Sequence, residues 1–224
     1  MTSEPRNRSH RSPGHSGNRP SGRRGRSGRG AFLAAALRSP REVGTLLPSG
    51  RALARRLATV VPRTRRDGRG PVIVEIGAGE GAVTAELAER VGSGATLIAI
   101  ERDPALADRL RARGLRADVV TADALTLRQV LAERGLDRAD AIVSVLPWTL
   151  LPAARQRELL EVLTGVLHSD GVFTAAAYSL GYWASTARRF RGELNRVFRE
   201  VVPTRTLWSN APPAMTYVCR QPIR

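Results

Sequence analysis

One segment constrains the fold of this chain more than any other. The apolar run Val72–Ile76 leads directly into Gly77, Gly79 and Gly81, and a helix-forming stretch follows. Glycine permits both the tight turn and the close approach of a ligand that such a strand-to-helix junction allows. A strand that turns on glycines into a helix is typical of the first half of a βαβ unit. The segment therefore predicts an α/β protein with a parallel sheet.

The chain after residue 70 repeats this alternation of strand and helix. The expected strands are Val72–Ile76, Ala95–Ile100, Leu115–Thr121, Ala141–Leu146, Gly171–Tyr178, Val197–Leu207 and Ala214–Arg220. The expected helices are Glu80–Val91, Pro104–Arg113, Thr126–Arg134, Pro152–His168 and Ser185–Asn195. Repeated βα units predict a seven-stranded, mostly parallel sheet with helices on both faces. The last two strands have no helix between them, so we expect them to pair antiparallel.

Charge divides the chain into three expected parts. Residues 1–30 hold eight Arg and one acid, residues 31–70 nine Arg and two acids, and residues 71–224 nineteen Arg and seventeen acids. We interpret 1–30, which after Met1 lacks Ala, Val, Leu, Ile, Met, Phe, Tyr and Trp, as a disordered basic tail. Residues 31–70 are expected to form an amphipathic helical segment and a linker, and 71–224 the folded domain. The basic first third indicates an anionic partner, either nucleic acid or a lipid surface.

Composition also excludes several classes of protein. A single Cys219 cannot form an internal disulfide, and one thiol with three scattered histidines predicts no metal site. The charge-free stretches are too short or too polar to cross a bilayer, and residues 1–37 make a poor export signal. We therefore expect a cytoplasmic protein without a membrane-spanning helix.

Residues 31–60 combine apolar and basic side chains. Ser49 is expected to cap a helix that runs to Val60, with Leu53, Leu57 and Val60 on one face. This helix either packs on the domain or seeks a membrane surface. The preceding apolar residues that are suited to a headgroup layer are Phe32, Leu33, Leu37, Leu46 and Leu47.

Acidic residues follow or end the first three strands of the domain. Glu75 precedes the glycines, Glu101 ends the second strand, and Asp123 follows the third. The carboxyl ends of parallel strands meet at one edge of a sheet, and an acid at Glu101 can accept both hydroxyls of a ribose. The pattern indicates a site for a nucleoside cofactor.

These features resemble the class I methyltransferases, Rossmann-like enzymes that use S-adenosyl-L-methionine (SAM). The resemblance implies that Glu75, Gly77, Ala78, Gly79 and Gly81 line the methionine end of SAM, that Glu101 holds its ribose, and that Asp123 contacts its adenine amine. It also implies that the loop after the fourth strand faces the methyl group. That loop supplies Ser144, Pro147 and Trp148 as candidate catalytic residues, with Tyr178 and Tyr182 as further walls for an amine.

A more specific resemblance covers most of the chain after the tail. Leu37-Arg-Ser-Pro-Arg-Glu-Val-Gly-Thr-Leu-Leu-Pro-Ser-Gly50, Ser144-Val-Leu-Pro147 and Trp208-Ser-Asn-Ala-Pro-Pro213 are similar to segments of bacterial phospholipid N-methyltransferases. Val145 replaces the glycine of their loop. The resemblance implies methylation of phosphatidylethanolamine by an enzyme that binds the inner, anionic face of the membrane through residues 1–60. Arg41 and Arg51 are candidates to hold the lipid phosphate.

Three other functions are left open by the residues themselves. The enzyme could methylate a small soluble acceptor, with residues 31–60 as a lid. It could methylate RNA, although adenine dimethylases carry Asn where this chain has Ser144. The chain could also bind SAM without being an enzyme.

Overall fold

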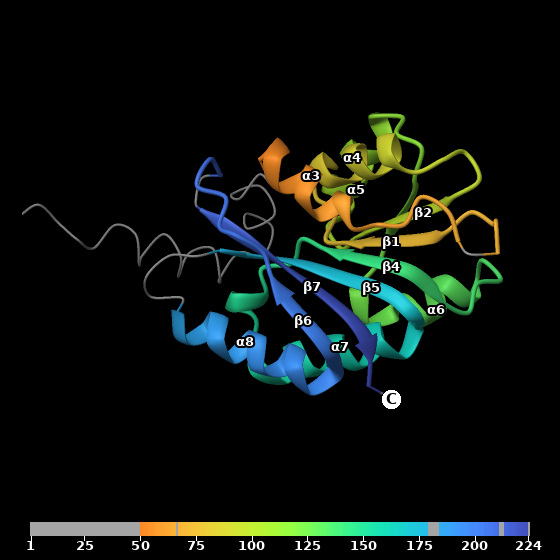
Figure 1. The fold of residues 1–224 in the computed structure, drawn as a ribbon. Helices are drawn as coiled ribbons and strands as arrows, with labels where there is room; N and C mark the ends of the chain where they lie inside the picture. Colours follow the sequence, from red (N-terminus) through yellow and green to blue (C-terminus); the bar gives the residue numbers. More distant parts are fainter. Residues whose placement is uncertain (1–49, 66, 179–183, 211–212, 224) are drawn as a thin grey trace, which may run out of the picture.

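A computed structural model describes residues 50–65, 67–178, 184–210 and 213–223. These residues build one seven-stranded sheet whose strand order is β3-β2-β1-β4-β5-β7-β6 (Figure 1). The strands are β1 Val72–Ile76, β2 Thr96–Glu101, β3 Asp118–Thr121, β4 Ala139–Ser144, β5 Leu167–Tyr178, β6 Phe198–Pro203 and β7 Ala214–Pro222. Strands β1 to β5 run parallel to one another, and β7 pairs antiparallel with both β5 and β6. The predicted Rossmann-like α/β fold, including its antiparallel last pair, is confirmed.

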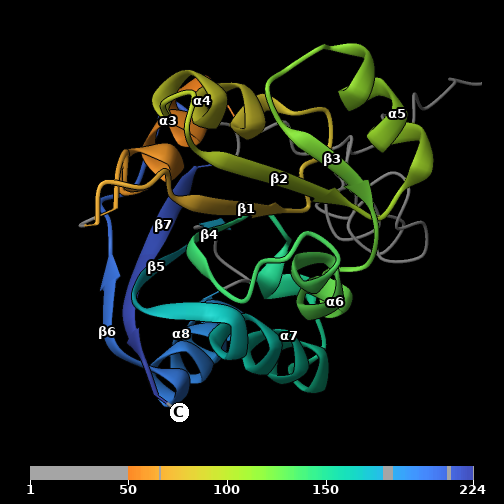
Figure 2. The same cartoon turned by 90° about the vertical axis from the view of Figure 1, so that its right-hand side faces the viewer.

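Helices cover both faces of the sheet. The longer helices are α3 Arg51–Thr59, α4 Ala82–Arg90, α5 Pro104–Ala112, α6 Leu127–Ala132, α7 Ala153–Val166 and α8 Ala184–Val197, and two short 3₁₀ turns span Ala124–Thr126 and Trp148–Leu150. Helices α3, α4 and α5 lie on one face, and α6, α7 and α8 lie on the other (Figure 2). None of the helices in the described ranges is long and apolar enough to cross a bilayer.

The strand order places a switch point beside β1. The chain leaves β1 toward β2 and β3, then returns to the other side of β1 through β4. Ligands of open α/β sheets bind at the carboxyl ends of the strands near such a reversal. The loops after β1, β2, β3 and β4 therefore share the edge at which a ligand is expected.

Alternation along β1 decides which side chains face which layer. Val72, Val74 and Ile76 join the core under α6, α7 and α8, whereas Ile73 joins the core under α3 and α4. Both faces of the strand are buried, which explains its nearly continuous apolar sequence. Glu75 has the parity of Ile73, so its carboxyl points to the α4 face.

Helix α3 is packed on the domain. Its Leu53, Ala54, Leu57 and Ala58 are at most 3% exposed and belong to the core formed with α4. Of the two interpretations of this helix, the structure selects the packed one, because its apolar face is already covered. The apolar residues 32–47 proposed for a headgroup layer lie outside the described residues.

The predicted cap of this helix is wrong. Gly50, not Ser49, occupies the N-cap position of α3, and no side chain caps the helix from it. The Gly50 N–H instead donates to Oδ1 of Asn210 at 3.0 Å, across 160 residues of sequence. A Cβ on Gly50 would lie 2.7 Å from that oxygen. A tertiary contact therefore replaces the local cap that the sequence favours.

Other boundaries shift by a few residues. Strand β5 begins at Leu167, inside the predicted helix, and β6 ends at Pro203 rather than Leu207. The backbone turns after Pro203, and Leu207 then forms an isolated bridge to Ala214. Pairing with a distant strand, which a local pattern does not report, sets these ends.

Candidate functional site

The turn of residues 77–81, here called the glycine turn, needs its glycines. Gly77, Gly79 and Gly81 have φ angles of +74°, +55° and +81°, in the left-handed region that other residues rarely adopt. The N–H groups of Gly77 and Ala78 donate to the Ile100 carbonyl oxygen, and the Gly81 N–H donates to the Ala78 carbonyl oxygen. These donors are satisfied within the protein. The turn thus offers close approach without side chains rather than a row of free N–H groups for phosphate.

The glycine turn touches the loop that follows β4, residues 144–148, here called the Ser144 loop. A Cβ on Gly77 would lie 2.8 Å from Cδ2 of Leu146. The Val145 N–H donates to the Ile76 carbonyl oxygen at 3.1 Å. The structure therefore brings the predicted cofactor loop and the predicted acceptor loop together, and a side chain at Gly77 would require the Leu146 side chain to shift.

Glu75 lies completely buried beneath the glycine turn. Its Oε2 accepts a hydrogen bond from Thr84 Oγ1 at 2.6 Å, whereas its Oε1 has no partner among the described residues. Burial, opposed by the Thr84 hydrogen bond and assisted by the charge of Glu101, raises the pKa of Glu75 from 4.5 to about 8. A buried carboxyl oxygen without a donor is uncommon and fits a ligand that brings one.

Glu101 ties the glycine turn to the end of β2. Its Oε2 accepts from the Gly79 N–H and its Oε1 accepts from the Asp103 N–H, both at 2.8 Å. Each oxygen keeps a second lone pair, as expected of a residue that also accepts two hydroxyls. Asp103 in turn caps α5, with its carboxylate accepting from the Ala105 and Leu106 N–H groups.

Asp123 has a partner that the sequence did not suggest. Arg155 Nη2, from the first turn of α7, lies 2.8 Å from both carboxylate oxygens of Asp123. The Leu125 N–H also donates to Asp123 Oδ1 at 2.9 Å. The ion pair holds the Asp123 side chain at the carboxyl edge. No local signal marks Arg155, because the two residues are 32 positions apart and belong to different βα units.

Two predicted catalytic side chains of the Ser144 loop, Ser144 and Trp148, form a hydrogen bond with each other. Trp148 Nε1 donates to Ser144 Oγ at 2.8 Å, and the two residues are 1% and 0% exposed. Trp148 also stacks on Phe190, with ring centroids 4.8 Å apart. Pro147 begins the following 3₁₀ turn and is half-buried. The structure thus gives Ser144 and Trp148 a role in shaping the loop, and their contact with an acceptor stays a prediction.

The remaining candidates are placed only in part. Tyr178 ends β5, with its backbone opposite Ala214, while its side chain, Tyr182 and Arg41 lie outside the described residues. Arg51 is exposed and pairs with Glu86 at 3.2 Å. It therefore lies on the surface of α3.

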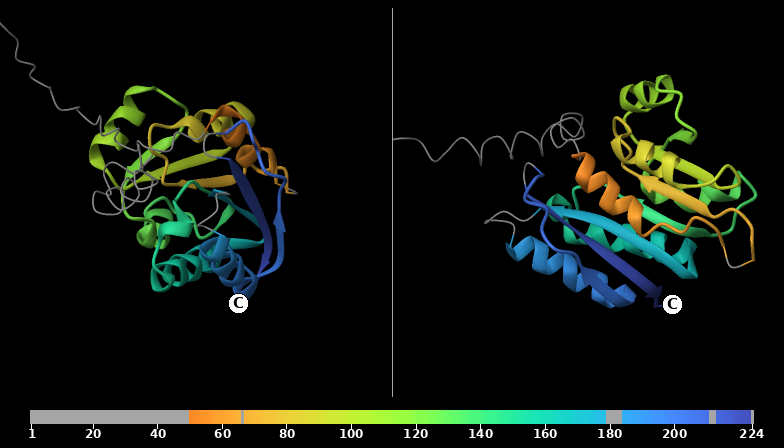
Figure 3. Two further views of the ribbon diagram at one scale, coloured as in Figure 1. Left: turned by 90° about the vertical axis from the view of Figure 1, so that its left-hand side faces the viewer. Right: turned by 45° about the horizontal axis from the view of Figure 1, so that its top comes forward.

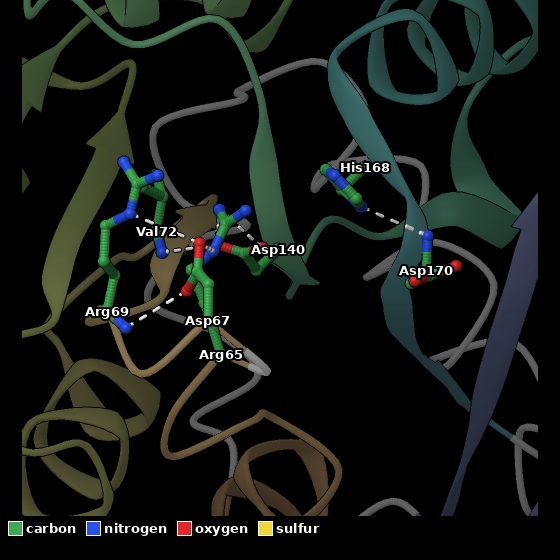
Figure 4. A network of polar contacts seen from close by, with 7 residues as sticks. All are labelled: Arg65, Asp67, Arg69, Val72, Asp140, His168 and Asp170. Carbon is green, nitrogen blue, oxygen red and sulfur yellow. Dashed lines mark hydrogen bonds and ion pairs between the residues drawn. The ribbon is translucent and has the colours of Figure 1, made fainter.

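A cavity of about 310 Å³ lies at the opposite edge of the sheet, among the linker before β1 and the starts of β4 and β5. Figure 4 shows its polar network. Asp140 Oδ2 accepts from the Val72 N–H at 2.8 Å and from Arg65 Nη1 at 3.1 Å, and Arg65 also pairs with Asp67. This network fastens the linker to the sheet, far from the loops that would hold a cofactor.

Replacing Asp140 with Ala is expected to lower the melting temperature by roughly 2–6 °C. The change leaves the buried Val72 N–H without its acceptor and removes one of the two acidic partners of Arg65, at a cost of about 1–2 kcal/mol. Thermal unfolding by circular dichroism measures the change. Asp170→Ala is the matched control, because Asp170 lines the same cavity but its contact in Figure 4 is made by the backbone N–H. An equal loss in both variants would refute the fastening role of Asp140.

Comparison with known proteins gives three kinds of similarity. A methyltransferase domain family model matches residues 73–171. The chain is 35% identical to an ornithine lipid N-methyltransferase of Singulisphaera acidiphila over 192 residues, which is 84% of this chain and 94% of the relative.

Solved structures show the same fold at low sequence identity. They include an O-methyltransferase from Bacillus cereus in complex with S-adenosylhomocysteine (18% identity, TM-score 0.58, 83% of this chain and 91% of the other). Human methyltransferase-like protein 13, also in complex with S-adenosylhomocysteine, has 17% identity and a TM-score of 0.58, with 77% of this chain and 82% of the other covered.

Proposed function

Because this chain belongs to the class I SAM-dependent methyltransferases, we propose that it methylates the amine of a membrane lipid, with ornithine lipid as the first acceptor to test. The similarity to a lipid N-methyltransferase along 94% of that relative's length carries the proposal. Phosphatidylethanolamine, the acceptor implied by the sequence motifs, is the second lipid to test.

SAM is the cofactor of this enzyme, and the described residues fit it. The unpartnered Oε1 of Glu75 is suited to accept from the methionine ammonium, and the glycine turn that follows Glu75 has no bulky side chain at Gly77, Gly79 or Gly81. We propose that Glu101 accepts the ribose hydroxyls and that Asp123, held by Arg155, accepts the adenine amine. SAM supplies a methyl group on a sulfonium, which is its own leaving group, so the protein needs no covalent nucleophile.

The protein's part in the reaction is to position a neutral amine. A primary aliphatic amine has a pKa near 10.4, so most of it is protonated at neutral pH. We propose that backbone groups of the Ser144 loop and the nearby Tyr178 orient the amine after it loses its proton. The hydroxyl of Ser144 serves this loop indirectly, by accepting from the Trp148 indole. Orientation of two reactants in one crevice accounts for a large part of such catalysis.

Arginines support a lipid acceptor. The first ten described residues, 50–59, carry Arg51, Arg55 and Arg56 and no acid, and the 49 residues before them carry ten Arg and two acids. Basic residues contribute on the order of 1 kcal/mol each toward an anionic leaflet. Binding of residues 1–60 to an anionic membrane remains part of this proposal.

A methyl-transfer assay with labelled SAM tests the proposal. Separate reactions contain anionic vesicles with ornithine lipid, the same vesicles with phosphatidylethanolamine, and total RNA without lipid. Label should enter the lipid extract in the ornithine lipid reaction, and Glu101→Ala should abolish it. Label in the phosphatidylethanolamine reaction alone would change the acceptor. Label in RNA, or in neither lipid despite measurable SAM binding, would overturn the proposal.

A further inference from the structure

An exposed tryptophan stands on the turn between β6 and β7, residues 207–210, here called the Trp208 turn. Trp208 is 77% exposed, more than Val202 at 46% and Ile223 at 42%, the other exposed large apolar residues in the described part of the chain. An indole offers a large apolar surface that water solvates poorly. Such exposure leaves the Trp208 side chain available to a partner surface.

Hydrogen bonds of the residues on both sides of Trp208 hold the turn in place. The Leu207 N–H donates to the Ala214 carbonyl oxygen at 2.7 Å, and the Asn210 N–H donates to the Leu207 carbonyl oxygen at 3.4 Å. Asn210 is 4% exposed and accepts from the Gly50 N–H. Both sides of Trp208 are therefore fixed to the domain, and its side chain projects from an ordered turn.

The Trp208 turn lies at the edge where the cofactor and the acceptor are expected to meet. Ala214 at the start of β7 pairs with Tyr178 at the end of β5, and β5 runs parallel to β4, which ends at Ser144. Figures 1 and 3 show the β6–β7 connection beside the start of α3, where the Asn210 contact joins them.

The described segments on the β5–β7–β6 side of this edge are basic, whereas the acids of the cofactor loops, Glu101 and Asp123, lie on the β1–β3 side. Residues 50–59, 184–192 and 203–210 contain no acid and seven arginines, namely Arg51, Arg55, Arg56, Arg188, Arg189, Arg191 and Arg205. Glu86 of α4 pairs with Arg51 and Arg55, and it does not pair with the other five arginines. Tryptophan favours the boundary between headgroups and acyl chains, and arginine favours lipid phosphate. This combination fits an anionic bilayer better than an apolar protein surface.

We propose that the Trp208 turn inserts into the headgroup layer of an anionic membrane and seats the carboxyl edge of the sheet against it. This inference rests on the proposed function, since it explains how a lipid amine reaches the Ser144 loop without leaving the bilayer. The Gly50–Asn210 hydrogen bond also sets the beginning of α3, and with it the arginines of this helix, beside the inserted indole.

Binding to vesicles separates this role from a structural one. The full chain is cosedimented with phosphatidylcholine vesicles that contain phosphatidylglycerol. Trp208→Ala should reduce partitioning about tenfold, as expected for loss of one inserted aromatic side chain. The matched control is Ile223→Ala, which removes an exposed apolar side chain beyond the other end of β7 and should change partitioning less than about twofold. In a Trp183→Phe background, which leaves Trp148 and Trp208, bromine-labelled lipids should quench Trp emission less when Trp208 is also replaced with Phe, because Trp148 is buried.

Methylation assays distinguish the ways in which this inference and the proposed function could fail. Trp208→Ala should methylate a short-chain, monomeric lipid amine at the wild-type rate and the same headgroup in vesicles several-fold more slowly. Unchanged vesicle binding, or an equal loss in Ile223→Ala, would overturn the inference. So would an equal loss on the monomeric acceptor, which would place Trp208 in the acceptor site. If the wild type methylates neither form, the proposed function fails, while the cosedimentation comparison still decides the role of Trp208.

Discussion

Replacing Glu75 with Gln should stabilise the fold at alkaline pH while it weakens SAM binding. Burial raises the pKa of this carboxyl in the folded protein to about 8, above its ordinary value of 4.5. The folded state therefore holds this proton more tightly than the unfolded state. Its contribution to stability is complete below about pH 4.5 and is lost as the pH rises through about 8. Gln carries no titrating proton, so the variant escapes this loss.

The stability difference should grow with pH. Near pH 4 the two proteins should unfold at similar temperatures, because Glu75 is mostly neutral in both states, and near pH 9 the variant should be more stable by roughly 2–4 kcal/mol. The Thr84 hydroxyl can donate or accept, so it can bond either end of the amide. Thermal unfolding across this pH range measures the effect. A variant that is less stable than the wild type at every pH would contradict the assignment of a neutral, buried acid.

SAM affinity should change in the opposite direction. The methionine end of SAM carries an ammonium, and the unpartnered Oε1 of Glu75 is the buried acceptor proposed for it. Loss of the ionisable acceptor should weaken SAM binding about 10–100-fold, as measured by titration calorimetry. Glu80→Gln is the matched control, since Glu80 belongs to the same turn but is exposed and pairs with Arg109. It should alter neither the pH profile nor the affinity.

The sequence predicted the fold well because the relevant signals are local. Val72–Ile76 is apolar at every position except Glu75, and the glycines after it occur at the spacing that a left-handed turn requires. Pro104 at the start of α5 and the acids at or near the carboxyl ends of the first three strands are likewise visible in the sequence. The strand order, with β7 between β5 and β6, comes from the structure and was not predicted from the sequence.

Contacts between distant segments were not predictable in the same way. Ser49 is a better capping residue than Gly50, yet α3 begins at Gly50 because Asn210 binds its N–H. The sequence singles out Asp123 but gives no sign that Arg155 pairs with it. Trp148 looks like a wall for an amine because it follows the β4 loop, whereas its burial against Phe190 depends on how α8 packs. In each case a partner from another βα unit decides the role.

Replacing Glu101 with Gln should cause the larger loss of cofactor binding. Both carboxylate oxygens accept backbone N–H groups, from Gly79 and from Asp103. In either orientation of a Gln side chain, its NH₂ group would face one of these donors, so one hydrogen bond is lost and replaced by repulsion. We expect SAM affinity to fall at least about 100-fold and the melting temperature to fall by roughly 2–6 °C.

Comparison of three ligands separates the roles of Glu75 and Glu101. SAM and S-adenosylhomocysteine contain both the amino-acid end and the nucleoside, whereas 5′-methylthioadenosine contains the nucleoside alone. Glu101→Gln should weaken all three, because they share the ribose. Glu75→Gln should weaken the first two and bind methylthioadenosine as the wild type does. If both variants lose methylthioadenosine equally, Glu75 acts by supporting the glycine turn through Thr84, and its unpartnered oxygen is not the acceptor for the methionine end.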